Sequence, residues 1–133
     1  MARHASRLLP SILVAEDYGL IGLMLYEDLS DAGFKVSGPF TSCAEALASL
    51  DTQTPDAAIL DIELNDGPCV ALAEALREKG IPFLVLTGHH SDPSYDGAFS
   101  GAPWLAKPMS HDDVIEALRT LLQARHGQEY VVT

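Results

Sequence analysis

The sequence has few basic residues and no long hydrophobic run. Lys and Arg number 8 against 19 Asp and Glu, so the formal net charge is −11 at pH 7. A chain this acidic repels nucleic acid phosphates and anionic lipids, and we expect it to bind neither nucleic acid nor a membrane. No segment approaches the roughly 20 apolar residues of a membrane-spanning helix, and the first ten residues hold no signal-peptide core. We therefore predict a cytoplasmic protein.

Cysteine is also scarce. Cys43 and Cys69 are too few and too far apart for the disulfide framework of a small secreted domain. Because both lie where helices are expected to start, we expect reduced thiols that pack within those helices. His4, His111 and His126 show no spacing to a cysteine that would indicate a zinc site.

With 133 residues, the chain fits one domain that can fold around its own core. Short apolar runs alternate with amphipathic stretches, which predicts an α/β fold with helices on both faces of a parallel sheet. The predicted strands are Ser11–Ala15, Phe34–Ser37, Ala57–Leu60, Phe83–Leu86 and Trp104–Ala106. The predicted helices cover 19–32, 43–50, 69–79 and 111–122. We expect an N-terminal extension over 1–10, the domain over 11–124, and a tail over 125–133 with no fused output domain.

Capping residues mark the ends of these helices. Gly33 stands where a C-terminal cap belongs, and Ser42 and Ser110 are each followed three residues later by an acidic residue, as in a capping box. Pro68 and Gly80 bracket the third helix, with proline in the first turn and glycine after the last. These signals fix the predicted boundaries.

The segment from Gly88 to Pro103 is the weak point of the pattern, because the alternation requires a helix there. Asp92 as N-cap and Pro93 in the first turn favour one short helix, whereas Gly97 and Gly101 weaken it. We expect a fourth helix that is short or disordered.

Polar side chains follow the apolar runs. Glu16 and Asp17 come after the first strand, Asp61 after the third, Thr87 after the fourth and Lys107 after the fifth. Ligands of open parallel sheets bind at the carboxyl ends of the strands, so these groups should meet at one edge. Three clustered carboxylates need a cation or a proton to be tolerated, and where a cation binds, oxygen ligands of this kind favour Mg²⁺.

Such a site can transfer a phosphoryl group. A carboxylate can act as a covalent acceptor, and the reaction asks the protein mainly for positioning and charge neutralisation. Asp61 would attack, Mg²⁺ would bridge the carboxylate and a phosphoryl oxygen, and Lys107 and Thr87 would bind the other oxygens.

The motifs together resemble a known family, the receiver domain of two-component response regulators. The resemblance covers residues 11–124 and rests on ED at 16 and 17, the strand-ending Asp61 in AAILDIEL, TG at 87 and 88, and W-x-x-KP ending in Lys107-Pro108. It implies a flavodoxin-like, doubly wound sheet of five strands in the order 2-1-3-4-5.

The resemblance also assigns roles. It implies phosphotransfer from a histidine kinase or phosphotransfer protein to Asp61, a backbone carbonyl of Glu63 as a further Mg²⁺ ligand, and a cis Lys107-Pro108 bond. Thr87 and Trp104 would form the conformational switch. Such a protein is no enzyme in the usual sense, although it assists its own phosphorylation and dephosphorylation.

TG at 87 and 88 and the run GAPWLAKP also resemble a single-domain subclass with a Phe-Ala-Thr-Gly motif. That subclass is often paired with kinases of the HWE type, although LVLTG here lacks the aromatic start of the motif. A stand-alone domain would act through a separate downstream protein. Whether the chain forms a homodimer is not decided by the sequence.

Two other functions remain as alternatives. One is a degenerate receiver that binds partners without phosphorylation. The other is a haloacid-dehalogenase-like phosphatase, since Asp61-Ile62-Glu63 echoes its D-x-D pair, but that enzyme has a longer chain and its nucleophile on the first strand. His89 and His90 follow the predicted site and either tune hydrolysis or are simply solvated.

Overall fold

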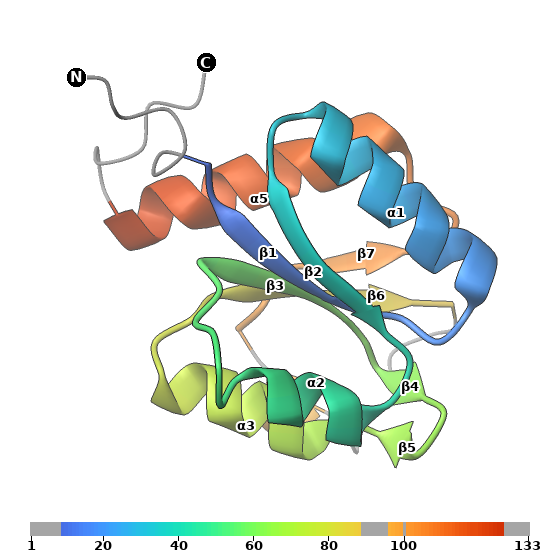
Figure 1. The fold of residues 1–133 in the computed structure, drawn as a ribbon, viewed down its shortest axis with the longest axis vertical. Coiled ribbons are helices and arrows are strands. Elements are labelled where there is room, and N and C mark those ends of the chain that lie inside the picture. The colour runs from blue at the N-terminus through green and yellow to red at the C-terminus, as the bar shows by residue number, and fades with distance from the viewer. Residues whose placement is uncertain (1–8, 89–95, 100, 127–133) are drawn as a thin grey trace.

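Five short apolar segments form the parallel sheet that their hydrophobicity predicts (Figure 1). The computed structural model describes residues 9–88, 96–99 and 101–126. The strands are β1 (Ser11–Ala15), β2 (Lys35–Phe40), β3 (Ala57–Asp61), β6 (Phe83–Thr87) and β7 (Trp104–Ala106). They lie in the order β2-β1-β3-β6-β7, which confirms the predicted order of a flavodoxin-like sheet.

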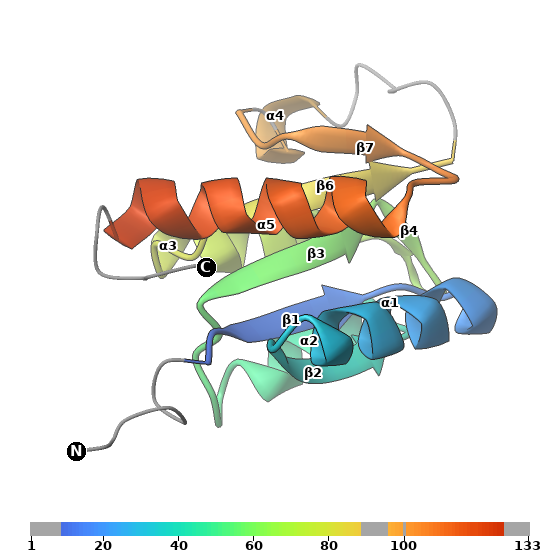
Figure 2. The ribbon, with the colours of Figure 1, turned by 90° about the horizontal axis from the view of Figure 1, so that it is seen from above.

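Helices cover both faces of this sheet (Figures 1 and 2). On one face lie α1 (Gly19–Asp31) and α5 (His111–His126), and on the other lie α2 (Cys43–Ser49) and α3 (Val70–Glu78). The fourth helix, α4 (Asp96–Phe99), is short as expected and packs near α3. The sheet is therefore the middle of three layers.

The alternation of side chains along each strand divides the core in two. Ile12 and Val14 of β1 point into the cluster under α1 and α5, whereas Leu13 and Ala15 point into the cluster under α2 and α3. All four are fully buried. Burial on both faces explains why the central strands are continuous apolar runs.

The caps predicted at Gly33, Ser42 and Ser110 are confirmed. Gly33 has a φ of +95°, the left-handed conformation of a helix C-terminus. The Ser42 hydroxyl accepts a hydrogen bond of 3.1 Å from the Glu45 backbone N–H, and the Ser110 hydroxyl accepts one of 3.0 Å from Asp113. These bonds set the first turns of α2 and α5.

Two predictions about elements were wrong. The second strand begins at Lys35 and continues to Phe40, past the predicted end at Ser37, because β1 pairs with it over that length. Pro68 does not open the third helix, whose N-cap is Cys69. It lies instead in a small antiparallel hairpin of β4 (Glu63–Leu64) and β5 (Gly67–Pro68).

The prediction of two reduced thiols was also wrong. Cys43 and Cys69 form a disulfide, with their Cα atoms 5.4 Å apart. The fold brings the first turns of α2 and α3 side by side, at a Cα separation that suits a disulfide. Sequence spacing could not show this contact, because it arises only when both helices pack on the same face of the sheet.

Several expected features lie outside the described residues, among them Asp92, Pro93, His89 and His90. Within the described ranges, no helix has the length and apolar character needed to cross a membrane.

Candidate functional site

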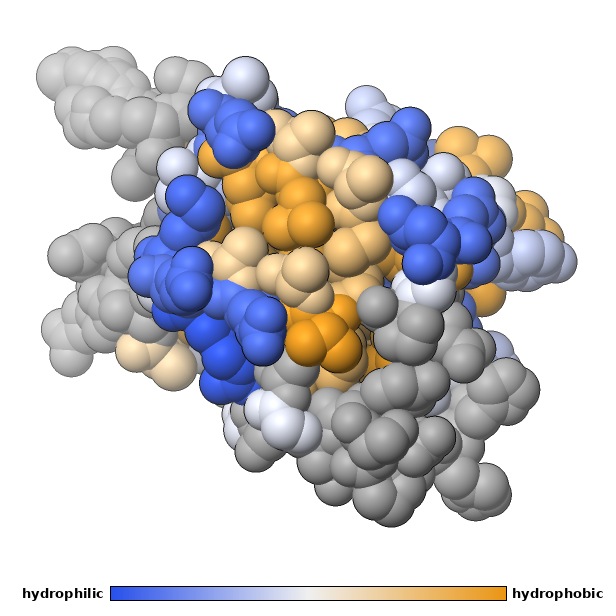
Figure 3. All heavy atoms as spheres, turned by 90° about the horizontal axis from the view of Figure 1, so that it is seen from below, coloured by the Kyte–Doolittle hydropathy of each residue, from blue (hydrophilic) through white to orange (hydrophobic). Residues whose placement is uncertain are grey.

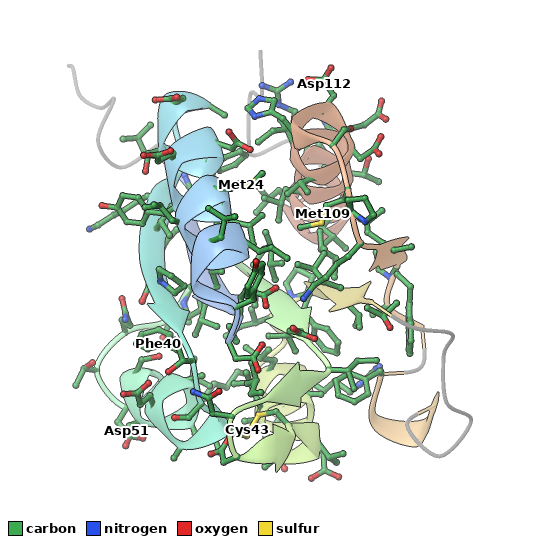
Figure 4. The ribbon with its side chains drawn as sticks, turned by 90° about the vertical axis from the view of Figure 1, so that its right-hand side faces the viewer. Met24, Phe40, Cys43, Asp51, Met109 and Asp112 are labelled. Atoms are coloured by element: carbon green, nitrogen blue, oxygen red, sulfur yellow. A yellow bond between two sulfur atoms is a disulfide. The ribbon has the colours of Figure 1, made fainter. Side chains whose placement is uncertain are left out.

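The parallel register brings the predicted polar residues to one edge of the sheet. Glu16 and Asp17 directly follow β1, whose last residue pairs with Leu60, the residue before Asp61. Asp61 in turn pairs with Leu86, next to Thr87. Figure 4 views the molecule from the side on which these strands end.

Lys107 joins the edge through its own strand. Thr87 pairs with Ala106, and the Lys107 backbone N–H donates to the Thr87 carbonyl over 2.8 Å. The bond between Lys107 and Pro108 is cis, as the resemblance implied. The chain therefore turns out of β7 with the lysine at the end of the sheet, beside the carboxylates.

The Lys107 ammonium contacts two of the three carboxylates. Its Nζ lies 2.7 Å from Oδ2 of Asp61 and 2.9 and 3.0 Å from Oε1 and Oε2 of Glu16. Both acids are buried, at 1% exposure for Glu16 and 7% for Asp61. Burial lowers the pKa of Lys107, but its hydrogen bonds to Asp61 and Glu16 outweigh that effect and raise the pKa above its usual value.

Glu16 is the most constrained of the acids. Burial raises the pKa of its carboxyl to about 7, even though hydrogen bonds from Lys107 and from the Tyr18 backbone N–H act in the opposite direction. The Tyr18 N–H donates to Oε2 over 3.1 Å. Oε1 is within ion-pair distance of Lys107 but accepts no hydrogen bond of good geometry within the described structure. Buried oxygens of this kind usually have a partner.

The three carboxylates are close enough to share a cation. One oxygen each from Glu16, Asp17 and Asp61 lies within 4.8 Å of the others. Asp17 is half-buried, so the cluster opens to solvent on its side. A small set of carboxylates open to water suits a hard divalent ion that keeps part of its hydration shell. The poorly satisfied Oε1 of Glu16 fits the same conclusion, because a cation would complete its coordination.

Trp104 lies in the packing between β7 and α4. Its indole N–H donates to the Phe99 carbonyl over 3.3 Å, and the two rings meet edge to face at 6.4 Å. Phe99 is fully buried in the core under α2 and α3, whereas Trp104 is half-buried.

The sequence interpretation missed the contacts that hold the segment after Asp61. The Asp66 carboxylate accepts hydrogen bonds from the backbone N–H groups of Cys43 and Ala44, over 2.7 and 3.1 Å. These bonds lower the pKa of Asp66. The pair Asp66-Gly67 was an available signal, since Asp-Gly is typical of tight hairpin turns.

Fold and site together define a class of protein. Its members have a doubly wound parallel sheet, and at the carboxyl ends of the strands a cluster of acidic residues contacts a lysine. The model of the response regulator receiver domain matches residues 12–119. The chain belongs to this family, and it is thus a receiver domain of the type found in two-component systems.

Named relatives support this assignment. The chain is 32% identical over 120 residues to the transcriptional regulatory protein PrrA of Mycobacterium tuberculosis, covering 87% of this chain and 51% of PrrA. It is 30% identical over 112 residues to the acid tolerance regulatory protein ActR of Rhizobium meliloti, covering 81% and 57%. The chain spans about half the length of the curated relatives it matches.

Solved structures agree on the fold. A CheY-like receiver domain from Methanospirillum hungatei has a TM-score of 0.82 at 22% identity, covering 90% of this chain and 98% of that one. A response regulator receiver protein from Sinorhizobium medicae has a TM-score of 0.79 at 28% identity, covering 88% and 97%.

Proposed function

We propose that this receiver domain accepts a phosphoryl group on Asp61 from a histidine kinase or phosphotransfer protein, in a Mg²⁺-dependent reaction, and signals to a separate protein. The observation that supports this most is the buried ion-pair network in which Lys107 contacts both Asp61 and Glu16. Buried charges of both signs are costly to maintain, and structure alone gives no need for them here. An acidic cation site beside a paired lysine is what phosphoryl transfer to a carboxylate requires.

Each polar group has a part in this proposal. Glu16, Asp17, Asp61 and the backbone carbonyl of Glu63 would hold Mg²⁺, which when bound neutralises negative charge between the acceptor and the phosphoryl group. Lys107 orients the Asp61 carboxylate through Oδ2 and offers its charge to a phosphoryl oxygen. The Thr87 hydroxyl would bind another phosphoryl oxygen.

The transfer needs no reactant besides the phosphohistidine, Asp61 and solvent water. An oxygen of Asp61 attacks the phosphorus of a phosphohistidine, and the new O–P bond forms as the P–N bond breaks. The bonding electron pair leaves with the imidazole nitrogen, which takes a proton from solvent. Hydrolysis later returns Asp61 to its free carboxylate.

Acetyl phosphate, a small phosphodonor, tests the acceptor. With Mg²⁺, intact-mass measurement should show one added phosphoryl group on the native chain and none on Asp61→Asn, because the amide keeps the shape but is a poor nucleophile. Asp51→Asn changes an exposed acid in the same way and should label normally. Full labelling of Asp61→Asn would exclude Asp61 as the acceptor.

The same measurement separates the alternatives. A degenerate receiver would show no added mass, and a phosphatase would release phosphate continuously without a stable mass increase. The position of Asp61 on β3, in the middle of the sheet, already disfavours the phosphatase, whose nucleophile belongs on the first strand.

The surface beside the site supports a protein as the phosphodonor. The first turns of α1 follow Asp17 and expose Leu20, Leu23 and Met24, each about half exposed. Large apolar side chains gathered on one exposed helix usually mark an interaction surface. Between α1 and the start of α5 lies a groove of about 160 Å³, lined by Met24 and Met109 among others (Figure 4). We infer that a helix of the kinase docks here.

A charged substitution on α1 should therefore affect the donor and leave the chemistry intact. We expect Leu23→Asp to reduce phosphotransfer at least about tenfold, from a panel of autophosphorylated histidine kinases, because an interface hot spot is worth 1–2 kcal/mol or more. Labelling by acetyl phosphate should not change. Ser30→Asp adds the same charge to the far end of α1 and is the control. Equal transfer to both variants would place the docking surface elsewhere.

A further inference from the structure

The disulfide encloses the segment that follows Asp61. Cys43 is the first residue of α2 and Cys69 is the N-cap of α3, 26 positions apart, and the chain between them contains β3 and the β4–β5 hairpin. The Cys69 backbone N–H donates to the carbonyl of Ile62, the residue directly after Asp61, over 3.2 Å. The bridge is therefore connected to Asp61 by one hydrogen bond, from Cys69 to Ile62, and one peptide bond, from Ile62 to Asp61.

Hydrogen bonds tie the hairpin to α2 on its other side. Asp66 accepts from the backbone N–H groups of Cys43 and Ala44, and the Asn65 N–H donates to the Thr41 carbonyl over 3.0 Å. The hairpin that begins at Glu63 is thus held between the first turns of α2 and α3. The position of the Glu63 carbonyl depends on both attachments.

α2 is a short helix that depends on tertiary contacts, because seven residues are too few for an isolated helix to be stable in water. Ala46 is buried and Leu47 packs against the core, and the bridge at Cys43 adds a covalent link at the first turn. The exposed residues of α2 and α3 include three alanines, Ala44, Ala48 and Ala71. Figure 3 views this side of the molecule and shows an apolar patch framed by hydrophilic residues.

The two cysteines differ in exposure. Cys69 as a residue is 1% exposed, whereas Cys43 is half-buried, so we expect a thiol from solution to attack on the Cys43 side. Cys69 would then be the leaving group at the N-cap of α3, where the helix dipole favours a thiolate. A better leaving thiolate speeds the exchange. In a reducing compartment, a disulfide with these features serves sensing more often than structure.

We propose that the Cys43–Cys69 bridge is a thiol–disulfide exchange site whose redox state controls the acceptor site, a regulation that rests on the proposed function. A thiolate of a thioredoxin-class dithiol attacks the Cys43 sulfur, the S–S bond breaks, and the electron pair leaves on Cys69, which takes a proton. The second thiolate of the dithiol then resolves the mixed disulfide and frees Cys43. Two electrons and two protons pass to this chain, and the dithiol becomes a disulfide.

Reduction removes the covalent link between Cys69, at the end of the segment from Ile62 to Cys69, and the first turn of α2. The segment then becomes more mobile, and the Glu63 carbonyl is positioned less precisely. We expect weaker Mg²⁺ binding and slower phosphorylation, by about fivefold or more, the lower end of usual coupling between sites. Bridged protein is thus the responsive form, and reduced protein the unresponsive one.

The experiment compares both forms of the full chain. One sample is oxidised with oxidised dithiothreitol, the other reduced with thioredoxin, its reductase and NADPH, and alkylation with mass measurement counts free thiols. Mg²⁺ affinity, amide exchange over 62–69 and the rate of acetyl phosphate labelling are then measured at a temperature where circular dichroism shows both forms folded. The double variant Cys43→Ser, Cys69→Ser should behave like reduced protein and should not respond to thioredoxin.

The outcomes separate this inference from the proposed function. Two alkylated thiols after oxidation, or a bridge that thioredoxin does not reduce, would overturn the exchange site. If thioredoxin reduces the bridge and neither the Mg²⁺ affinity nor the labelling rate changes, the disulfide is purely structural. The proposal that its redox state controls the acceptor site would then be wrong. If neither form is labelled, the proposed function fails, and the Mg²⁺ affinities of the two forms still decide whether the bridge is coupled to the site.

Discussion

Among the individual residues, the buried Glu16 should make the stability of the protein depend on pH. Its carboxyl is almost fully buried and has a pKa of about 7, against an ordinary value of 4.5. Between these two pH values, the folded chain binds more protons at this position than the unfolded chain does. Stability from this group is therefore highest below about pH 4.5 and is lost as the pH rises to about 7.

We predict that the apo protein loses on the order of 3 kcal/mol of unfolding free energy through Glu16 over this window. Mg²⁺ must displace the proton, so its affinity should fall about tenfold per pH unit below pH 7 and level off above it. Urea unfolding without metal and Mg²⁺ titration by calorimetry, each from pH 5 to 8, measure the two effects. In Glu16→Gln, the unfolding free energy should no longer fall between pH 5 and 7. If it falls with pH as steeply as in the native chain, another group is responsible for the titration.

At the level of elements, α1 approaches the end of β2 closely enough to need a glycine. A Cβ atom on Gly22 would lie 3.0 and 3.1 Å from Cγ and Cβ of Pro39, and 3.9 Å from Cγ of Glu16. Phe40 fixes this end of β2, because its carbonyl accepts the Glu16 N–H over 2.9 Å. The helix therefore packs directly against Pro39, the neighbour of the residue whose carbonyl holds the Glu16 backbone.

We predict opposite effects for two glycine substitutions in α1. Alanine usually stabilises a helix interior by up to about 1 kcal/mol over glycine, but at Gly22 overpacking against the rigid proline ring costs about 1–3 kcal/mol. Gly22→Ala should therefore be less stable than the native chain. Gly19→Ala meets nothing within 4 Å and should be neutral or slightly stabilising. Urea unfolding compares the two, and equal gains in stability would show that α1 shifts away without cost.

The sequence predicted every strand of the main sheet and missed the β4–β5 hairpin and the disulfide, for physical reasons. β1 occurs with the predicted bounds because a buried apolar strand flanked by turn residues leaves a local signal, and β7 also has the predicted bounds although its residues are only partly buried. The β4–β5 hairpin has two residues in each strand, too few to show any period. The Cys43–Cys69 pair left no signal either, since its contact depends on how α2 and α3 pack. The polar residues at the strand ends could be found because the parallel topology alone brings them together.

For the whole molecule, the open question is how a change at the site reaches a distant surface. The route with direct contacts runs from Thr87 to Lys107 by a backbone hydrogen bond, and along β7 to Trp104. Trp104 then contacts Phe99 through its N–H and its ring, and Phe99 joins α4 to the core under α3. A small shift of β7 against β6 would therefore change the packing on the α3 and α4 side of the molecule.

Trp104 is the single tryptophan, so its fluorescence can report such a shift. Beryllofluoride with Mg²⁺ mimics the phosphorylated state, in which the Thr87 hydroxyl should move toward a phosphoryl oxygen and alter the space beside the ring. A difference of about 1–3 kcal/mol between two packings is enough to exchange their populations. We predict a change in Trp104 emission and in its quenching by acrylamide on saturation of the site.

Two threonine variants locate the origin of this signal. Thr87→Ala should reduce the emission change even when beryllofluoride is bound, because the hydroxyl that would move toward the phosphoryl oxygen is gone. Thr120→Ala removes an exposed hydroxyl on α5, which donates to the Glu116 carbonyl over 3.0 Å, and should leave the change intact. If emission and quenching stay constant in the native chain at full occupancy, Trp104 is a static core residue. The signal would then have to leave the site through the segment from Gly88 to Pro103, without a switch of Trp104.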